Sequence, residues 1–338
     1  MTCQKPTFCS LTRISDLATA PFEIRKLPRD QWANGDYVMG RVVSLANYGS
    51  NIELANGRMT EAAHGDDLIG AFGVRAATLE AVGSWRDIQD DGQMQVLTGA
   101  GLIGRATSVS PHIQRLLDLE YRGHLVRNGT KVVMKDFVKP VADVRFDFPT
   151  VLIIGTSMSA GKTTVGKLIV RQLSRSALRV AAVKLTGAGR FRDTLAMQDA
   201  GADDIFDFVD AGLPSTVCDP SEYRQALSVV SQKLVDAAPD VVIAEAGASP
   251  LEPYSGDVLI DEIREQVKFT VLCATDPYAV VGVTKGFGFK PDLVAGIATT
   301  TSSAVKLVTK LTGIRALNLL DPDSHEELRE LLKTKLGV

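Results

Sequence analysis

The sequence lacks the features typical of membrane-spanning, secreted and nucleic-acid-binding proteins. No stretch approaches the roughly 18 to 20 apolar residues needed to cross a bilayer, although 45% of its 338 residues are hydrophobic. The N-terminal stretch has no apolar core of the kind found in secretion signals. The formal net charge is only −3, so no general basic field attracts nucleic acid. We therefore expect a cytoplasmic protein that uses neither a membrane nor a nucleic acid.

Cysteine and histidine are also scarce, and their spacing does not indicate a metal site. The four cysteines are Cys3, Cys9, Cys218 and Cys273. Cys3 and Cys9 are close enough in sequence to pair, but scattered reduced thiols are favoured. His64 beside Asp66 and Asp67 is interpreted as a solvated turn, because a metal site needs three or four convergent groups.

The length allows two domains, and the N-terminal half has the pattern of a β-rich one. Residues 1–30 contain three prolines and are expected to be an irregular lead-in. Residues 31–140 carry strand patterns at 37–43 and 77–82, and the pair Asn128-Gly129 predicts a two-residue hairpin turn. The glycine-rich segment 97–110 is either a second ligand loop or, as we favour, a set of barrel corners. Together these patterns predict a small barrel or sandwich.

Residues 148–338 follow a different pattern, in which short apolar runs alternate with helical periodicity. Strands are expected at 151–155, 178–185, 240–244, 269–274, 293–298 and 314–319. Helices are expected at 221–237, 257–266, 302–312 and 324–335, with Ser302 or Ser303 capping the third and Ser324 and Glu327 forming a capping box on the last. This alternation predicts an α/β domain with three α/β/α layers, in which helices cover both faces of a mostly parallel sheet.

The stretch VLIIGTSMSAGKTT, residues 151–164, predicts a buried strand, a phosphate-binding loop and the first turn of a helix. Backbone amides at a helix N-terminus bind anions, and Gly161 lets the backbone approach phosphate closely. Lys162 is expected near solvent and within reach of the β- and γ-phosphates, and the Thr163 hydroxyl is placed to ligate Mg²⁺. The expected nucleotide-binding residues are Gly155, Thr156, Ser157, Met158, Ser159, Ala160, Gly161, Lys162, Thr163 and Thr164. The first glycine lies one residue earlier than in the usual spacing, so the motif is a variant.

Charged residues at the ends of the next strands extend this site, because ligands of parallel sheets bind beyond the carboxyl ends of the strands. Lys184 is a candidate clamp for a substrate anion or the γ-phosphate, although a surface lysine remains an alternative. Asp193 is a candidate Mg²⁺ ligand or a helix cap. Glu245 ends an apolar strand, where Mg²⁺ would offset the cost of its burial. Residues 299–301 are a candidate resting place for the base, and the absence of Asn-Lys-x-Asp favours ATP over GTP.

These motifs resemble two families of P-loop proteins over about residues 149–320. The dethiobiotin synthetase and cobyrinic acid amidation family has the loop Gly-Thr-x4-Gly-Lys-Thr, and its second and third strands end in groups similar to Lys184, Asp193 and Glu245. In that family the third strand ends in a glycine-rich segment, and two of its glycines correspond here to Ala246 and Ala248. Uncharacterised P-loop proteins linked to D-glutamate metabolism are similar in layout, and their Glu-Gly-Gln-Gly-Ser segment aligns with Glu245 and Ser249. The resemblance implies Mg·ATP chemistry on a small carboxylated molecule, in a dimer.

The leading hypothesis is an ATP-dependent ligase or small-molecule kinase. Lys162, Lys184 and Glu245 would be catalytic, and Thr163, Asp193 and Glu245 would hold Mg²⁺. A nucleotide-gated switch or metallochaperone is one alternative. A protein that binds a nucleotide or a CoA-like phosphate without cleaving it, similar to an acyltransferase, is another.

Overall fold

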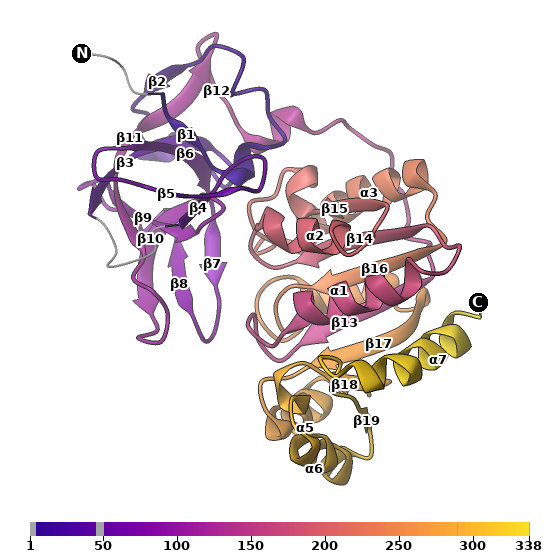
Figure 1. Cartoon of the computed structure of the whole chain (residues 1–338). Helices are drawn as coiled ribbons and strands as arrows, with labels where there is room; N and C mark the ends of the chain where they lie inside the picture. Colours follow the sequence, from indigo (N-terminus) through magenta and orange to yellow (C-terminus); the bar gives the residue numbers. More distant parts are fainter. Residues whose placement is uncertain (1–4, 45–50, 289, 338) are drawn as a thin grey trace. The chain divides into compact units, whose positions relative to one another are not determined.

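The structure is a computed structural model that describes residues 5–44, 51–288 and 290–337 (Figure 1). The chain forms two compact units. The β-rich unit comprises Met1–Pro140 together with the segments Ala188–Arg192 and Phe208–Val217. The parallel-sheet unit comprises Val141–Gly187, Asp193–Asp207 and Cys218–Val338. Two short segments from the C-terminal half therefore complete the β-rich unit.

The β-rich unit is built on a sheet that closes on itself. Its strands are β1 (Thr7–Phe8), β2 (Glu23–Arg25), β3 (Tyr37–Ser44), β4 (Asn51–Glu53), β5 (Met59–Glu61), β6 (Asp67–Phe72), β7 (Val74–Ala76), β8 (Ala81–Ser84), β9 (Gln93–Thr98), β10 (Leu102–Val109), β11 (Leu117–Arg127) and β12 (Thr130–Lys131). The order β6-β3-β11-β9-β10 is closed by pairing of β10 with β6. Of the two predicted forms, the strand pairing is therefore that of a barrel. Its core includes Val42, Phe72, Met94, Ile103 and Leu119.

Several local predictions for this unit can be compared with the structure. Asn128 and Gly129 have positive φ angles of 51° and 82° and join Arg127 to its partner Thr130, so the two-residue turn is confirmed. Segment 97–110 covers the end of β9, a turn and β10, which pairs with β9. The strand predicted at 77–82 is wrong, because a turn at Ala77–Glu80 separates β7 from β8 and leaves Leu79 57% exposed.

Two further interpretations concern polar and N-terminal residues. The N-terminal stretch expected to be irregular contributes β1 and β2 to the sheet. The acids beside His64 serve the local fold, since Asp67 pairs with Arg41 and Asp66 accepts a hydrogen bond from the Ala63 amide. In the described ranges there is no group of three or more His, Cys, Asp or Glu side chains that could hold a metal ion.

The second unit is a doubly wound α/β fold in which every strand pair is parallel. Its strands are β13 (Thr150–Gly155), β14 (Val180–Thr186), β15 (Asp204–Asp207), β16 (Val241–Ala246), β17 (Val267–Cys273), β18 (Leu293–Ala295) and β19 (Arg315–Ala316). They are arranged in the order β15-β14-β16-β13-β17-β18-β19. The helices are α1 (Lys162–Leu173), α2 (Phe191–Gln198), α3 (Pro220–Ala237), α4 (Gly256–Ile263), α5 (Pro277–Phe287), α6 (Ser302–Thr312) and α7 (His325–Leu336).

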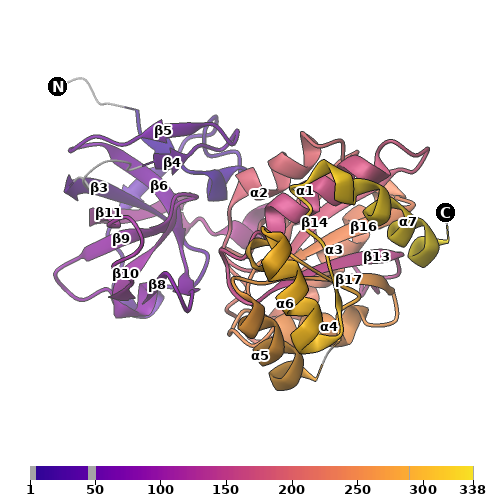
Figure 2. The same ribbon diagram turned by 60° about the horizontal axis from the view of Figure 1, so that its bottom comes forward.

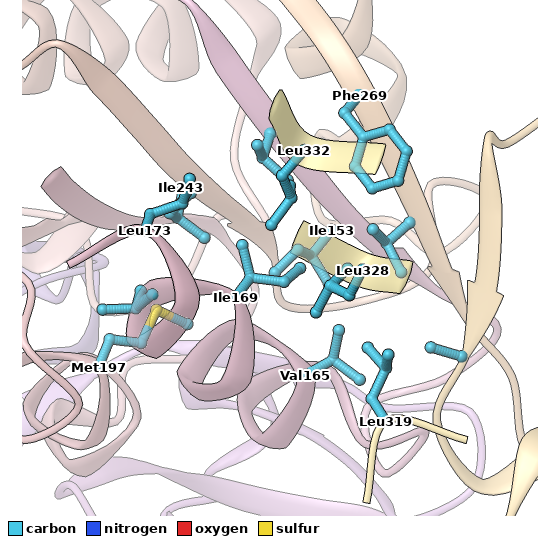
Figure 3. Packing of buried hydrophobic residues seen from close by; sticks show 14 of the residues in the cluster. Ile153, Val165, Ile169, Leu173, Met197, Ile243, Phe269, Leu319, Leu328 and Leu332 are labelled. Carbon is cyan, nitrogen blue, oxygen red and sulfur yellow. The ribbon is translucent and has the colours of Figure 1, made fainter. Parts of the chain in front are cut away.

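The main core of this unit lies between one face of the sheet and helices α1 and α7 (Figure 3). Val165, Ile169 and Leu173 recur at the spacing of one helical face and pack onto alternate strand residues such as Ile153 and Ile243. Helices α3 and α4 contact β14, and they lie across the sheet from α1 and α7 (Figure 2). The predicted three-layer arrangement is thus present.

The sequence patterns missed some elements and misplaced some caps. They did not predict α2, β15 or α5. Thr301, and not Ser302 or Ser303, caps α6 by accepting a hydrogen bond from the Ala304 amide. Ser324 makes no capping hydrogen bond, because its hydroxyl donates to the Asn318 and Asp321 carbonyls. Among the described residues, no helix has the length and apolar character to cross a membrane.

Candidate functional site

The site is built on the loop of residues 156–161, which joins β13 to α1. Gly161 precedes the helix with φ of 95°, a left-handed conformation that favours glycine. In the described part of the chain, the backbone amides of Met158, Ala160 and Gly161 have no hydrogen-bond acceptor. Unpaired amides beside a helix N-terminus form a site for an anion.

Hydrogen bonds to the end of β17 hold the first residue of the loop, Thr156. The Thr156 amide donates to the Cys273 carbonyl at 3.0 Å, and the Thr156 hydroxyl oxygen accepts from the Thr275 amide at 3.2 Å. These contacts hold the start of the loop at the carboxyl end of the sheet, where the strand order changes direction.

Lys162 lies beneath the loop and not in solvent, which corrects the prediction from sequence. The side chain is buried, and its Nζ donates to the Ser157 carbonyl at 2.6 Å. A Cβ at Gly155 would lie 2.8 Å from the Lys162 Nζ and 2.9 Å from its Cδ, so a larger residue there would displace the Lys162 side chain. Burial lowers the pKa of the Lys162 ammonium, although nearby Glu245 opposes this effect. The Ser157 hydroxyl is also buried and has no hydrogen-bond partner in the described residues.

Strand register brings Lys184 and Glu245 side by side next to the loop. Lys184 on β14 pairs with Glu245 on β16, and Glu245 pairs with Ile153 on β13. Because side chains alternate along a strand, both charged groups lie on the face of the sheet that α1 covers. Glu245 is 2% exposed, and the Thr163 hydroxyl donates to its Oε2 at 3.1 Å. Burial raises the pKa of the Glu245 carboxyl, and Asp193 adds to this effect.

Asp193 completes the group from the first turn of α2. The Lys184 Nζ donates to the Asp193 Oδ2 at 2.6 Å. Burial by itself would lower the pKa of Lys184, but the surrounding acids Asp193, Glu245 and Asp207 raise it above the ordinary value. The structure therefore brings together Lys162, Thr163, Lys184, Asp193, Glu245 and Asp207. From the sequence, all of these residues except Asp207 are expected near the loop.

Asp207 is the acid that sequence reasoning missed. It ends β15, a strand of four residues that was not predicted, and it is 1% exposed. The only available signal was the short run Asp204-Ile205-Phe206-Asp207 after a helical pattern.

The other predicted nucleotide-binding residues lie along the loop, and the last of them reaches a cavity. Ser159 and Thr164 are exposed. Thr164 lines a cavity of about 110 Å³ together with Leu168, Thr300 and Asn318. Thr300 belongs to the segment predicted to receive a base, whereas Thr299 and Thr301 make local contacts, to the Gly296 carbonyl and the Ala304 amide.

The buried strand β13, the loop that contains Gly161 and the helix α1 form a candidate phosphate-binding loop at the carboxyl end of a parallel sheet. No known family matches the sequence, and no curated protein is similar to it. Solved structures with a similar fold include the hydrogenase maturation factor HypB from Archaeoglobus fulgidus, with 16% identity over 56% of this chain and 90% of that one and a TM-score of 0.39. HypB from Helicobacter pylori in complex with nickel has 15% identity over 56% and 87%, with a TM-score of 0.37. A DUF1611 family protein from Anabaena variabilis has 13% identity over 62% and 66%, with a TM-score of 0.37.

Proposed function

We propose that the parallel-sheet unit binds Mg·ATP and transfers the terminal phosphoryl group to a small carboxylated metabolite, as a ligase or kinase does. The observation that supports this most strongly is the convergence of Lys162, Thr163, Lys184, Asp193 and Glu245 at one edge of the sheet. These residues come from two helices and two strands, and they lie beside the loop that carries the unpaired amides.

The residues at the loop fit a polyphosphate. The amides of Met158, Ala160 and Gly161 supply donors, and the buried Ser157 hydroxyl, which has no hydrogen-bond partner in the part of the chain that the structure describes, could donate to a phosphate oxygen. The Lys162 ammonium is already held under the loop by the Ser157 carbonyl, so little side-chain ordering is needed to add a phosphate contact.

The Thr163 hydroxyl and the Glu245 carboxylate fit Mg²⁺, because both are oxygen ligands and they lie within 3.1 Å of each other. Asp193 is the further candidate ligand. When bound, the ion would neutralise phosphate charge. Burial raises the pKa of the Glu245 carboxyl, and a bound cation would offset the cost of burying its charge.

Lys184 is suited to bind the acceptor anion. Lys184 is buried near the end of β14. Thr186, two positions further along, has a buried hydroxyl without a hydrogen-bond partner in the described residues. A carboxylate or carbamate would accept hydrogen bonds from both groups. This role for Lys184 agrees with the resemblance to dethiobiotin synthetase, in which such an oxygen is phosphorylated and then displaced by an amine.

The cavity beside Thr164 is the candidate base site. It is lined by Ile297, Leu319 and Leu320 in addition to the polar Thr300 and Asn318. Apolar walls with a few polar groups are typical of nucleobase pockets. ATP is the proposed nucleotide, because the guanine-reading motif is missing from the sequence.

The test is phosphate release by the full chain with Mg²⁺ and either ATP or GTP, in the presence and absence of pooled amino and keto acids. We expect ATP turnover that rises at least tenfold with an acceptor, and a loss of at least about 100-fold in Lys162→Ala. Lys167→Ala, on the same helix, is the matched control and should be within about twofold of wild type. Slow release that no metabolite changes would instead support a nucleotide-gated switch, and binding without release would support a nucleotide- or CoA-binding role.

A further inference from the structure

Asp207 has no role in the mechanism above, yet it lies in the same row of side chains. Lys184 on β14 is paired with Asp207 on β15 on one side and with Glu245 on β16 on the other. Asp207, Lys184 and Glu245 are 1%, 5% and 2% exposed as whole residues. A buried row of acid, lysine and acid thus crosses three adjacent parallel strands.

On each of the three strands, the charged residue lies two positions after an apolar core residue, so both point to the same face of the sheet. Ile205, Ala182 and Ile243 belong to the core under α1, and the charged residues stand two positions further along each strand. The charges therefore share the α1 face and lie where that face opens toward the loop. Burial there requires compensation between the charges, because an isolated ion in such a position is costly.

One lysine in this row is shared by three acids. Asp193 hydrogen-bonds to Lys184, while Glu245 and Asp207 act on it electrostatically. Two of the three, Asp193 and Glu245, are also the acids proposed to hold Mg²⁺. A metal ion and Lys184 would therefore compete for the same two carboxylates, and Asp207 is the acid outside that competition.

We propose that Asp207 is a positioning residue that neutralises Lys184 and so leaves Asp193 and Glu245 available to the metal. It acts through Lys184 and not by contact with nucleotide or acceptor. The metal part of this inference rests on the proposed function, whereas the coupling of Asp207 to Lys184 does not.

Thermal unfolding of the nucleotide-free full chain tests the coupling by itself. Asp207→Asn should lower the Tm of wild type by about 3 °C or more, because Lys184 loses a counter-charge. In the Lys184→Gln background the same change should raise the Tm, because it removes a buried acid that has lost its partner. The matched control is Asp204→Asn, on the same strand, where the partner is Arg179; its effect should be equal in both backgrounds. Equal loss of Tm from Asp207→Asn in both backgrounds would overturn the proposal, since it would mean a structural role independent of Lys184.

Metal binding tests the second part. Mn²⁺ titration of the protein with a non-hydrolysable ATP analogue, followed by electron paramagnetic resonance, should show at least fivefold weaker metal binding in Asp207→Asn. Affinity for the analogue without metal should not fall. Unchanged Mn²⁺ affinity would overturn the metal part of the proposal. If wild type binds neither Mn²⁺ nor the analogue, the proposed function fails, while the thermal result still decides the coupling.

Discussion

Each of the two units buries a glutamate, and the two carboxylates differ in how many hydrogen bonds they accept. Glu53 in the β-rich unit is completely buried, and its oxygens accept from the Phe191 amide at 2.9 Å, the Arg192 amide at 2.8 Å and the Ser10 hydroxyl. Glu245 in the parallel-sheet unit is 2% exposed and, among the described residues, accepts only from the Thr163 hydroxyl.

The difference separates a carboxylate with several hydrogen-bond donors in the fold from one with a single donor in the described residues. Three donors replace the water that Glu53 loses on burial, so removing this residue leaves buried donors without a partner. A single hydroxyl does not replace that water for Glu245, and burial raises its pKa despite the nearby Lys184 and Lys162. A bound cation stabilises the charged form of a carboxylate that is buried in this way.

The largest expected effect is on turnover by Glu245→Gln. If Glu245 holds the metal, phosphate release should fall at least about 100-fold, because an amide oxygen is a much weaker Mg²⁺ ligand than a carboxylate. Phosphate release at saturating Mg²⁺ and ATP is the measurement. The exposed Glu265→Gln serves as control and should behave as wild type. If Glu245→Gln retains its turnover, the role of Glu245 is structural, like that of Glu53.

The next effect is on folding, and it concerns Glu53→Ala. Loss of the acceptor for two backbone amides and a hydroxyl should lower the free energy of unfolding by about 3 kcal/mol. Urea denaturation measures this value. Glu53→Gln keeps one acceptor oxygen and should lose less. A change below about 1 kcal/mol for Glu53→Ala would remove the contrast between the two acids.

The smallest effect is the pH dependence of stability contributed by Glu245. Its pKa in the folded protein lies above the ordinary value of 4.5, so the folded state holds the proton more tightly than the unfolded chain. The free energy of unfolding should therefore fall as pH rises from about 4.5 through the folded pKa, and then level off. Glu245→Gln lacks this loss, so its stability relative to wild type should increase over that window. Urea denaturation at pH 4 and pH 8 compares the two proteins, and a relative stability that decreases with pH would contradict the assignment.

Much of the parallel-sheet unit was predictable because its signals are local. The run at 151–155, the glycine at 161 and the Lys-Thr pair lie within one short stretch, and the strand-end rule then pointed to Lys184, Asp193 and Glu245. The turn at Asn128-Gly129 was predictable for the same reason, since these two residues tolerate positive φ.

The errors occurred where a turn or a competing hydrogen bond, and not the periodicity of the residues, decided the local structure. The alternating pattern predicted one strand across the turn at Ala77–Glu80, because alternation does not show that the chain reverses there. Ser324 had the sequence of a capping box, but its hydroxyl donates to Asn318 and Asp321 carbonyls instead. Lys162 was expected in solvent, whereas the Ser157 carbonyl and the Glu245 strand enclose it.

By itself the sequence determined the alternation of strands and helices in the second half of the chain, the loop between β13 and α1 and the chemical types of the strand-end groups, because each depends on residues that are neighbours in the chain. Only the tertiary structure decided that Asp207, Lys184 and Glu245 form one buried row, and that Glu53 is fully hydrogen-bonded while Glu245 is not. Strand register and the burial of charge depend on residues up to about 140 positions apart, as in the contact of Glu53 with Arg192, and no local pattern of residues encodes them.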